Sequence, residues 1–217
     1  MKISVKFHFL ILFCFYFNPF IQSAYPKSAF GDFKTKHLYS FKSFSFQKDS
    51  SDFLLNAFKK GHSKDKIISI PKGHRPLPSN YLKRKYIRRH LRKFKSGASF
   101  LIPEDILGKF GRTILGRNDG QFVMCKKEMD DLISNSNGEI TFIEIELGIP
   151  SGLWNNIELI RIDIPKPKRL HIRMPSGNEI GANELWIPGG KLPNGFSESV
   201  IDPIPQGQYS ETKIKKK

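Results

Sequence analysis

Cysteine is scarce in this chain, and several familiar catalytic motifs are missing from it. Cys14 and Cys125 are its only cysteines. We expect Cys14 to be removed with a leader, so the mature chain has no internal disulfide and too few thiolates for a cysteine-based zinc site. HExxH, GxGxxG and GxxxxGK[ST] sequences do not occur, and GFSES (195–199) departs from GxSxG. We therefore expect neither a bound metal, a dinucleotide-binding fold nor a Walker-type phosphate loop.

Long apolar runs are missing beyond the N-terminus. Residues 1–23, MKISVKFHFLILFCFYFNPFIQS, begin with a basic region, continue through an apolar run and end near small residues. This is the pattern of a secretory signal peptide. The run is shorter than the roughly 20 apolar residues of a membrane span. The sequence predicts a secreted protein, with no stable membrane insertion after the leader is removed.

Acidic residues are scarce in the first half of the chain. Residues 1–99 hold 21 Lys or Arg and 4 Asp or Glu, whereas residues 100–203 hold 11 and 15. The net charge of +16 therefore comes from the N-terminal half and the C-terminal tail. A polyanion needs cations along its binding surface, and the second half of the chain does not supply them. This half by itself is therefore better suited to a small substrate with one or two phosphates than to a polyanion.

The domain organisation that we predict has four parts. Residues 1–23 form the leader, 24–78 a basic, poorly ordered arm or linker, 79–212 the catalytic domain, and 213–217 a basic tail. The catalytic domain opens with an amphipathic helix over 79–97, whose basic side is most simply a solvated face. Contact of this face with RNA or a membrane surface is the alternative.

The remaining elements predict an α+β fold, with N-terminal helices followed by a small, mainly antiparallel sheet and long Gly-rich loops. Helices are expected at 104–111, 126–138 and, with a strand as the alternative, 139–150. Strands are expected at 98–103, within 112–124, at 158–164, at 169–174 and within 196–204.

The loop 176–194 is long for a connection between strands and is rich in Gly and polar residues, which is typical of functional loops. Its candidate substrate-binding residues are Ser176, Asn178, Glu179, Asn183 and Trp186. The indole either stacks on a base or nicotinamide ring or fills the core. Both interpretations stay open at this point.

Charged residues on the predicted strands are further candidates for substrate binding. Arg161 and Asp163 share one strand face, and a structural salt bridge is their simplest meaning. His171 and Arg173 lie on the next predicted strand. His90 lies beside the apolar face of the first helix, where a packed histidine is the simpler interpretation.

Four motifs carry a resemblance to known proteins. LGRNDGQFVM, IELGIPSGLW, LIRIDIP and RMPSGNEIGANELWIPGGKLPNGFSESVID resemble C-terminal toxin modules of bacterial polymorphic toxins of the Rhs and contact-dependent-inhibition kind, from Tyr81 to about Tyr209. Their order is similar to NAD-glycohydrolase toxins of the ADP-ribosyltransferase superfamily. This resemblance implies that Arg117 or Arg112 holds the NAD pyrophosphate and that Glu198 acts near the ribose. The sequence lacks that superfamily's Ser-Thr-Ser element and E-x-E pair, so hydrolysis is at least as plausible as ADP-ribosyl transfer.

We therefore expect a secreted bacterial toxin or effector that cleaves NAD as its substrate, without a cofactor, and has an immunity protein as a candidate partner. One alternative is a metal-independent ribonuclease, with His90 or His171 as general acid or base and Arg161 or Arg173 stabilising the phosphorane. The other is a non-enzymatic secreted binding protein.

Overall fold

The computed structural model of the 217-residue chain describes Leu54 and residues 56–215. The predicted signal peptide and most of the predicted arm lie outside the described residues. Within the described part, no helix combines the length and apolar character that a membrane crossing needs.

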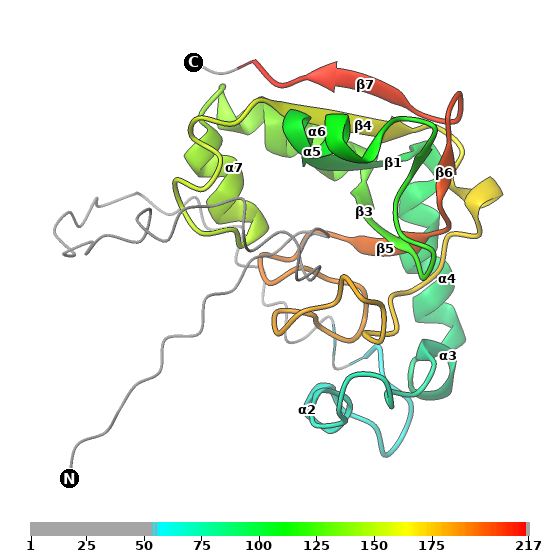
Figure 1. The fold of residues 1–217 in the computed structure, drawn as a ribbon. Helices are drawn as coiled ribbons and strands as arrows, with labels where there is room; N and C mark the ends of the chain where they lie inside the picture. The colour runs from blue at the N-terminus through cyan, green and yellow to red at the C-terminus, as the bar shows by residue number, and fades with distance from the viewer. Residues whose placement is uncertain (1–53, 55, 216–217) are drawn as a thin grey trace, which may run out of the picture.

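A five-stranded antiparallel sheet forms the centre of the fold (Figure 1). Its order is β5-β3-β1-β4-β7, and every neighbouring pair is antiparallel. The strands are β1 (Ala98–Pro103), β3 (Gln121–Cys125), β4 (Leu159–Ile164), β5 (Glu198–Ile201) and β7 (Ser210–Lys213). A separate ribbon pairs β2 (Ile114–Leu115) with β6 (Ile204–Pro205). The predicted α+β class with a mainly antiparallel sheet is confirmed.

The central strand β1 explains why the segment ASFLIP is almost continuously apolar. Its side chains alternate between the two faces: Phe100 and Ile102 enter one core cluster, and Leu101 enters another. Both faces are covered, so β1 has no solvent-facing row of polar residues.

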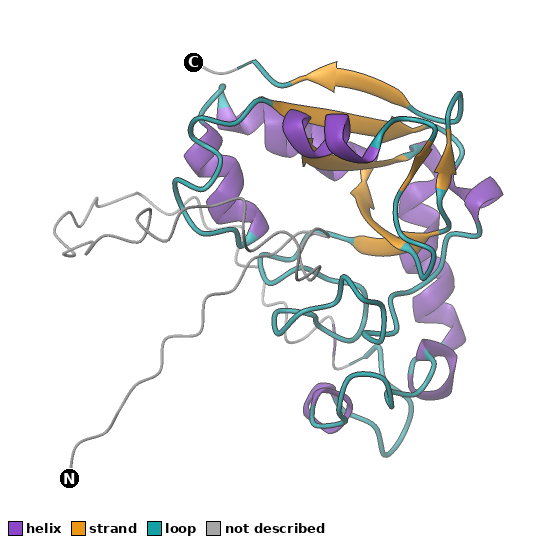
Figure 2. Cartoon of the chain, viewed as in Figure 1, coloured by secondary structure: helices purple, strands orange, loops and turns teal. Residues whose placement is uncertain are grey.

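The sequence predicts helices that come before the sheet, but in the structure only some of the helices do. α5 (Glu104–Phe110), α6 (Lys126–Ser136) and α7 (Ile140–Leu147) lie between strands along the chain (Figure 2). The ambiguous segment 139–150 is helical because its buried Glu144 accepts hydrogen bonds from the backbone of the turn after α7, at Gly152 and Trp154. A strand would not place this carboxylate over that turn.

The helix predicted over 79–97 is divided into three pieces. α3 (Pro78–Tyr81) ends at Leu82, which is extended (φ −96°, ψ 146°), and α4 (Arg84–Arg92) continues into the 3-10 helix η2 (Lys93–Ser96). Leu82 pairs with Phe58 in an isolated bridge. A tertiary contact with the arm therefore interrupts the helix that periodicity predicts.

The described part of the predicted linker is a packed part of the fold. It contains α2 (Lys64–Ile68), and its Ala57, Phe58 and Ile67 are buried. These side chains join a core cluster with Tyr81 and Trp186. Residue 79 is therefore not the edge of the folded unit.

One strand prediction is wrong, and one strand is missing from the predictions. Residues 169–174 do not form a strand, because Pro167 begins the 3-10 helix η3 (Pro167–Leu170) and His171 then has a left-handed backbone (φ 47°). β7 was not predicted, because its residues are all exposed and lack the apolar alternation that marks a half-buried strand. It is held as an edge strand by pairing with β4.

Candidate functional site

Glu198 begins β5 at one edge of the sheet. Its pairing with Met124 places its side chain on the sheet face that also carries Val200. The residue is 8 % exposed. Its backbone N–H donates to the carbonyl of Gly190, and its carbonyl accepts from Nε2 of His90 at 2.8 Å. The carboxyl group itself makes no hydrogen bond with any described residue.

Burial, together with the nearby charge of Glu179, raises the pKa of Glu198 to about 8. Desolvation penalises the charged form of a carboxyl group, and a like charge penalises it further. Glu198 is therefore protonated at neutral pH in the free protein. Enzymes that use two carboxyl groups in catalysis commonly keep one of them protonated in this way.

Glu179 is the second carboxylate of the site and is held by its own loop. It is 7 % exposed. It accepts hydrogen bonds from the backbone N–H groups of Ser176 and Gly177, both at 2.8 Å, and from the Ser176 hydroxyl at 3.0 Å. The two carboxyl groups therefore have different surroundings. Hydrogen-bond donors hold that of Glu179, whereas that of Glu198 has no donor among the described residues.

Other polar atoms without partners belong to the same region. The Tyr81 hydroxyl and Trp186 Nε1 are buried and have no hydrogen-bond partner. Both residues belong to the core cluster that contains Val200, and the charge of Glu179 helps burial to raise the pKa of Tyr81. Buried polar groups are almost always paired. Two unpaired donors therefore lie in the core cluster on the sheet face of Glu198.

The arm holds the loop that carries Glu179. The amide oxygen of Asn178 accepts from the backbone N–H groups of Gly73 and Arg75, and its Nδ2 donates to the Arg75 carbonyl. Lys72 Nζ donates to two carbonyls of the loop, and the Arg75 guanidinium donates to the Gly177 carbonyl. This contact could not be predicted from the sequence, because residues 72–75 have no periodicity or motif.

The structure separates the two arginines that the sequence offered as phosphate ligands. Asp119 accepts a hydrogen bond from the backbone of Ile180, so the turn that carries Arg117 lies against the Glu179 loop. Arg112 instead pairs with Glu104 and with Glu211 of β7, each at 2.9 Å. β7 and β5 are opposite edges of the sheet. The structure therefore does not bring Arg112 to Glu198.

Trp186 does not present a free ring face for stacking. It is 6 % exposed, it packs in the core, and the Arg75 guanidinium lies 4.6 Å from its ring centroid. The core interpretation of this residue is the one that the structure supports. Asn183 also has a local contact, since its side-chain oxygen accepts from the backbone of Leu185.

Arg161 and Asp163 form the expected salt bridge at 2.8 Å. Arg161 also pairs with Asp130 of α6. The pair lies beneath α6 on β4, two strands away from β3 and three from β5. Neither residue is therefore placed to contact a substrate at Glu198.

The two candidate histidines have contrasting environments. His90 is 3 % exposed, and burial lowers its pKa to about 4. It is packed against β5, where no RNA can reach it. The His171 side chain is 81 % exposed, and its Nδ1 lies 2.6 Å from Asp202. Arg173 binds the same carboxylate at 2.6 Å, so the structure brings these three residues together.

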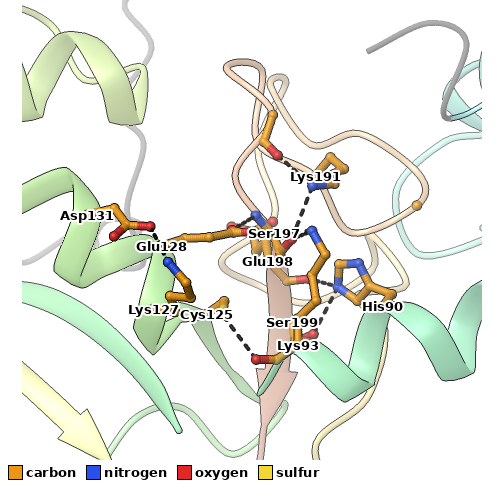
Figure 3. Close-up of polar contacts among 12 residues, drawn as sticks. His90, Lys93, Cys125, Lys127, Glu128, Asp131, Lys191, Ser197, Glu198 and Ser199 are labelled. Carbon is orange, nitrogen blue, oxygen red and sulfur yellow. Dashed lines mark hydrogen bonds and ion pairs between the residues drawn. The ribbon is translucent and has the colours of Figure 1, made fainter. Parts of the chain in front are cut away.

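A polar cluster surrounds Ser197, the residue that precedes β5 (Figure 3). Its hydroxyl lies 2.9 Å from Lys93 Nζ, 3.1 Å from Lys191 Nζ and 2.9 Å from Glu128. Ser197 has no exposed surface, which argues against a nucleophilic role. The cluster ties η2, α6 and the loop together directly behind Glu198.

The described residues contain no group of three His, Cys, Asp or Glu side chains that could hold a metal ion. Comparison of the chain with family models, curated proteins and solved structures found no match.

Proposed function

We propose that the protein is a secreted toxin or effector that hydrolyses the nicotinamide–ribose bond of NAD. The observation that carries this proposal is the buried carboxyl group of Glu198, which has no hydrogen-bond partner among the described residues and lies within the electrostatic reach of Glu179. The resemblance of the GRNDGQFV and PGGKLPNGFSE segments to NAD-glycohydrolase toxins supports the choice of substrate.

A cationic substrate fits this arrangement better than a neutral one. The ionised form of Glu198 is unstable in the free protein because burial and Glu179 both oppose it. The nicotinamide ring of NAD is positively charged, and the ribose C1′ becomes positive as the bond breaks. The cationic substrate favours loss of the Glu198 proton to solvent, and the resulting negative charge in a water-poor site stabilises the developing positive charge strongly. The interaction is greatest in the transition state, which is what catalysis requires.

In this reaction the bond between C1′ and the ring nitrogen breaks, and its electron pair leaves with nicotinamide. A water molecule adds its oxygen to C1′ and releases one proton. Glu179 is the candidate base for that proton, because its carboxylate is held in place by three donors. Arg117 is the candidate partner of the pyrophosphate, since guanidinium groups bind phosphates through paired hydrogen bonds. The products are nicotinamide and ADP-ribose.

The test is NAD consumption by the purified chain lacking residues 1–23, with nicotinamide release followed by chromatography. We expect Glu198→Gln and Glu179→Gln each to reduce kcat by about 100-fold or more, equivalent to about 2.7 kcal/mol. The exposed Glu139→Gln variant makes the same change from carboxyl group to amide and is the control. An active Glu198→Gln variant, or no NAD loss with any form of the protein, would refute the proposal.

The exposed His171–Asp202–Arg173 group supports a ribonuclease as the second candidate. Asp202 orients the imidazole, and a guanidinium beside it could stabilise a phosphorane. Degradation of tRNA by the same preparation, abolished by His171→Asn but not by Glu198→Gln, would favour this function. Loss of NAD without tRNA degradation would exclude it.

A further inference from the structure

The basic residues of α4 form an exposed row along one side of the helix. Arg84, Arg88 and Arg92 are four residues apart, so they lie one above another on the same face, and all three are exposed. Tyr86 and His90 are buried on another face. Because these buried side chains hold α4 against the protein, the row is presented by a fixed element.

Further exposed cations lie beyond the C-terminal end of α4. Lys95 of η2 is exposed, and η2 packs against η3, where Lys168 and Arg169 are also exposed. Figure 1 shows α4 along one side of the molecule, away from the α6 and α7 side. We name six residues the basic track: Arg84, Arg88, Arg92, Lys95, Lys168 and Arg169.

The residues of the basic track have no acidic partners among the described residues. The stretch 78–97 contains no Asp or Glu. None of the six track residues makes an ion pair with a described residue, whereas Lys93, which lies between Arg92 and Lys95, pairs with Glu128 at 3.2 Å. A row of like charges repels itself, and it attracts a partner of opposite charge.

We propose that the basic track binds the phosphate backbone of a nucleic acid duplex without reading its sequence. This inference is independent of NAD cleavage. Arg84 and Arg92 are separated by about 12 Å along the helix axis. Neighbouring arginines of the row are about 6 Å apart along the helix axis, so each of the three can contact a separate phosphate of the duplex. Arginine suits them because its planar fork binds phosphate at two points.

A duplex fits better than a single strand or a membrane surface. Proteins that bind single strands use exposed aromatic rings as stacking platforms, but Tyr86 and Phe94 are buried. Helices that bind membrane surfaces insert an apolar face, and the apolar side of α4 is occupied inside the protein. Contacts with phosphates alone carry no sequence information.

The test is fluorescence anisotropy with labelled DNA and RNA duplexes of about 20 base pairs, at about 50 to 200 mM KCl. We expect log K to fall with log salt with a slope of about −4 to −5, from about five phosphate contacts. The variant Arg84→Gln/Arg88→Gln/Arg92→Gln should reduce the slope by about 3. Thermal melting confirms that the variant is folded.

The matched control is Lys60→Gln/Lys64→Gln/Lys109→Gln, which removes the same charge from exposed positions on other elements. It should leave the slope unchanged. Equal effects of the two triple variants would mean that only net charge matters and would overturn the proposal. Binding to vesicles containing phosphatidylserine without binding to either duplex would overturn it as well.

Discussion

The side chain of His90 donates from Nε2 to the main-chain carbonyl of Glu198 at 2.8 Å. The carbonyl can only accept, so this contact requires the imidazole tautomer that carries its proton on Nε2. The contact joins α4 to the start of β5, directly behind the candidate carboxyl group. Two buried titratable residues are therefore adjacent, and each prefers its neutral form, His90 with a pKa of about 4 and Glu198 with a pKa of about 8.

This pair predicts opposite dependences of stability on pH. The His90 pKa is lowered from 6.5, so the folded state loses stability as the pH falls from 6.5 to about 4. The Glu198 pKa is raised from 4.5, so the folded state loses stability as the pH rises from 4.5 to about 8. The two effects oppose each other between 4.5 and 6.5.

The window from pH 6.5 to about 8 therefore reports mainly on Glu198, because the lowered pKa of Lys191, about 8, affects stability mainly above it. We expect the free energy of unfolding, measured with urea, to fall there by up to about 1.4 kcal/mol per pH unit. In Glu198→Gln this slope should disappear, because the amide does not ionise. A variant that keeps the wild-type slope would show that Glu198 is not the group that titrates.

Arg117 and Arg112 provide a matched pair for the proposed reaction. The Arg117 turn lies against the Glu179 loop, whereas Arg112 pairs with Glu104 and Glu211 near the opposite edge strand. We expect Arg117→Ala to raise KM for NAD about tenfold, or about 1.4 kcal/mol, and Arg112→Ala to leave KM within about twofold. Steady-state kinetics on both variants measure this difference. The reverse result would place the phosphate site at the other edge of the sheet.

Local sequence signals were sufficient for much of the fold. β1 and β4 have the apolar patterns expected of buried strands. α6 ends at Ser136, and the next residue, Asn137, has the left-handed conformation expected of a stop signal. Glu198 was identified as a candidate from motif order, and its position at a buried edge of the sheet is compatible with that choice.

Long-range contacts account for what the sequence could not reveal. Leu82 interrupts a periodic helix because it pairs with Phe58, and no local propensity encodes that partner. The charge of Arg112 looked equivalent to that of Arg117 along the chain, but their neighbours come from distant strands. Glu179 was one polar residue among several in its loop, and only the fold sets it beside Glu198.

The contact between the arm and the Glu179 loop predicts that residues 56–78 are required for folding and activity. Asn178 makes three hydrogen bonds to Gly73 and Arg75. Its replacement by Ala removes them, and the two part-buried bonds to Arg75 together contribute about 1–3 kcal/mol. We expect Asn178→Ala to lower the urea midpoint and to reduce NAD cleavage. A fragment beginning at residue 79 should not fold cooperatively, because it exposes Tyr81 and Trp186.

The control for this prediction is Asn194→Ala, which also removes a side chain that donates to two carbonyls, those of Ile145 and Glu146, but at an exposed position. It should change the urea midpoint little, because water can replace the lost bonds. A fragment of residues 79–217 with a sharp unfolding transition and full activity would contradict the role given to the arm.

Alanine substitutions at Gly177 and at Gly207 distinguish the cost of backbone strain from the cost of steric crowding at the candidate site. Both have a left-handed backbone, with φ of 81° and 86°. An alanine Cβ at Gly177 would lie 2.7 Å from Arg75 Nη1 and from two atoms of the Trp186 ring, whereas at Gly207 it would meet nothing within 4 Å. Each substitution costs about 1–2 kcal/mol of strain, and Gly177→Ala adds about 1–3 kcal/mol of overpacking. Chemical denaturation of both variants measures the difference. Equal destabilisation would mean that the Arg75–Trp186 contact moves aside freely, and Glu179 would then lack the rigid support that its proposed role requires.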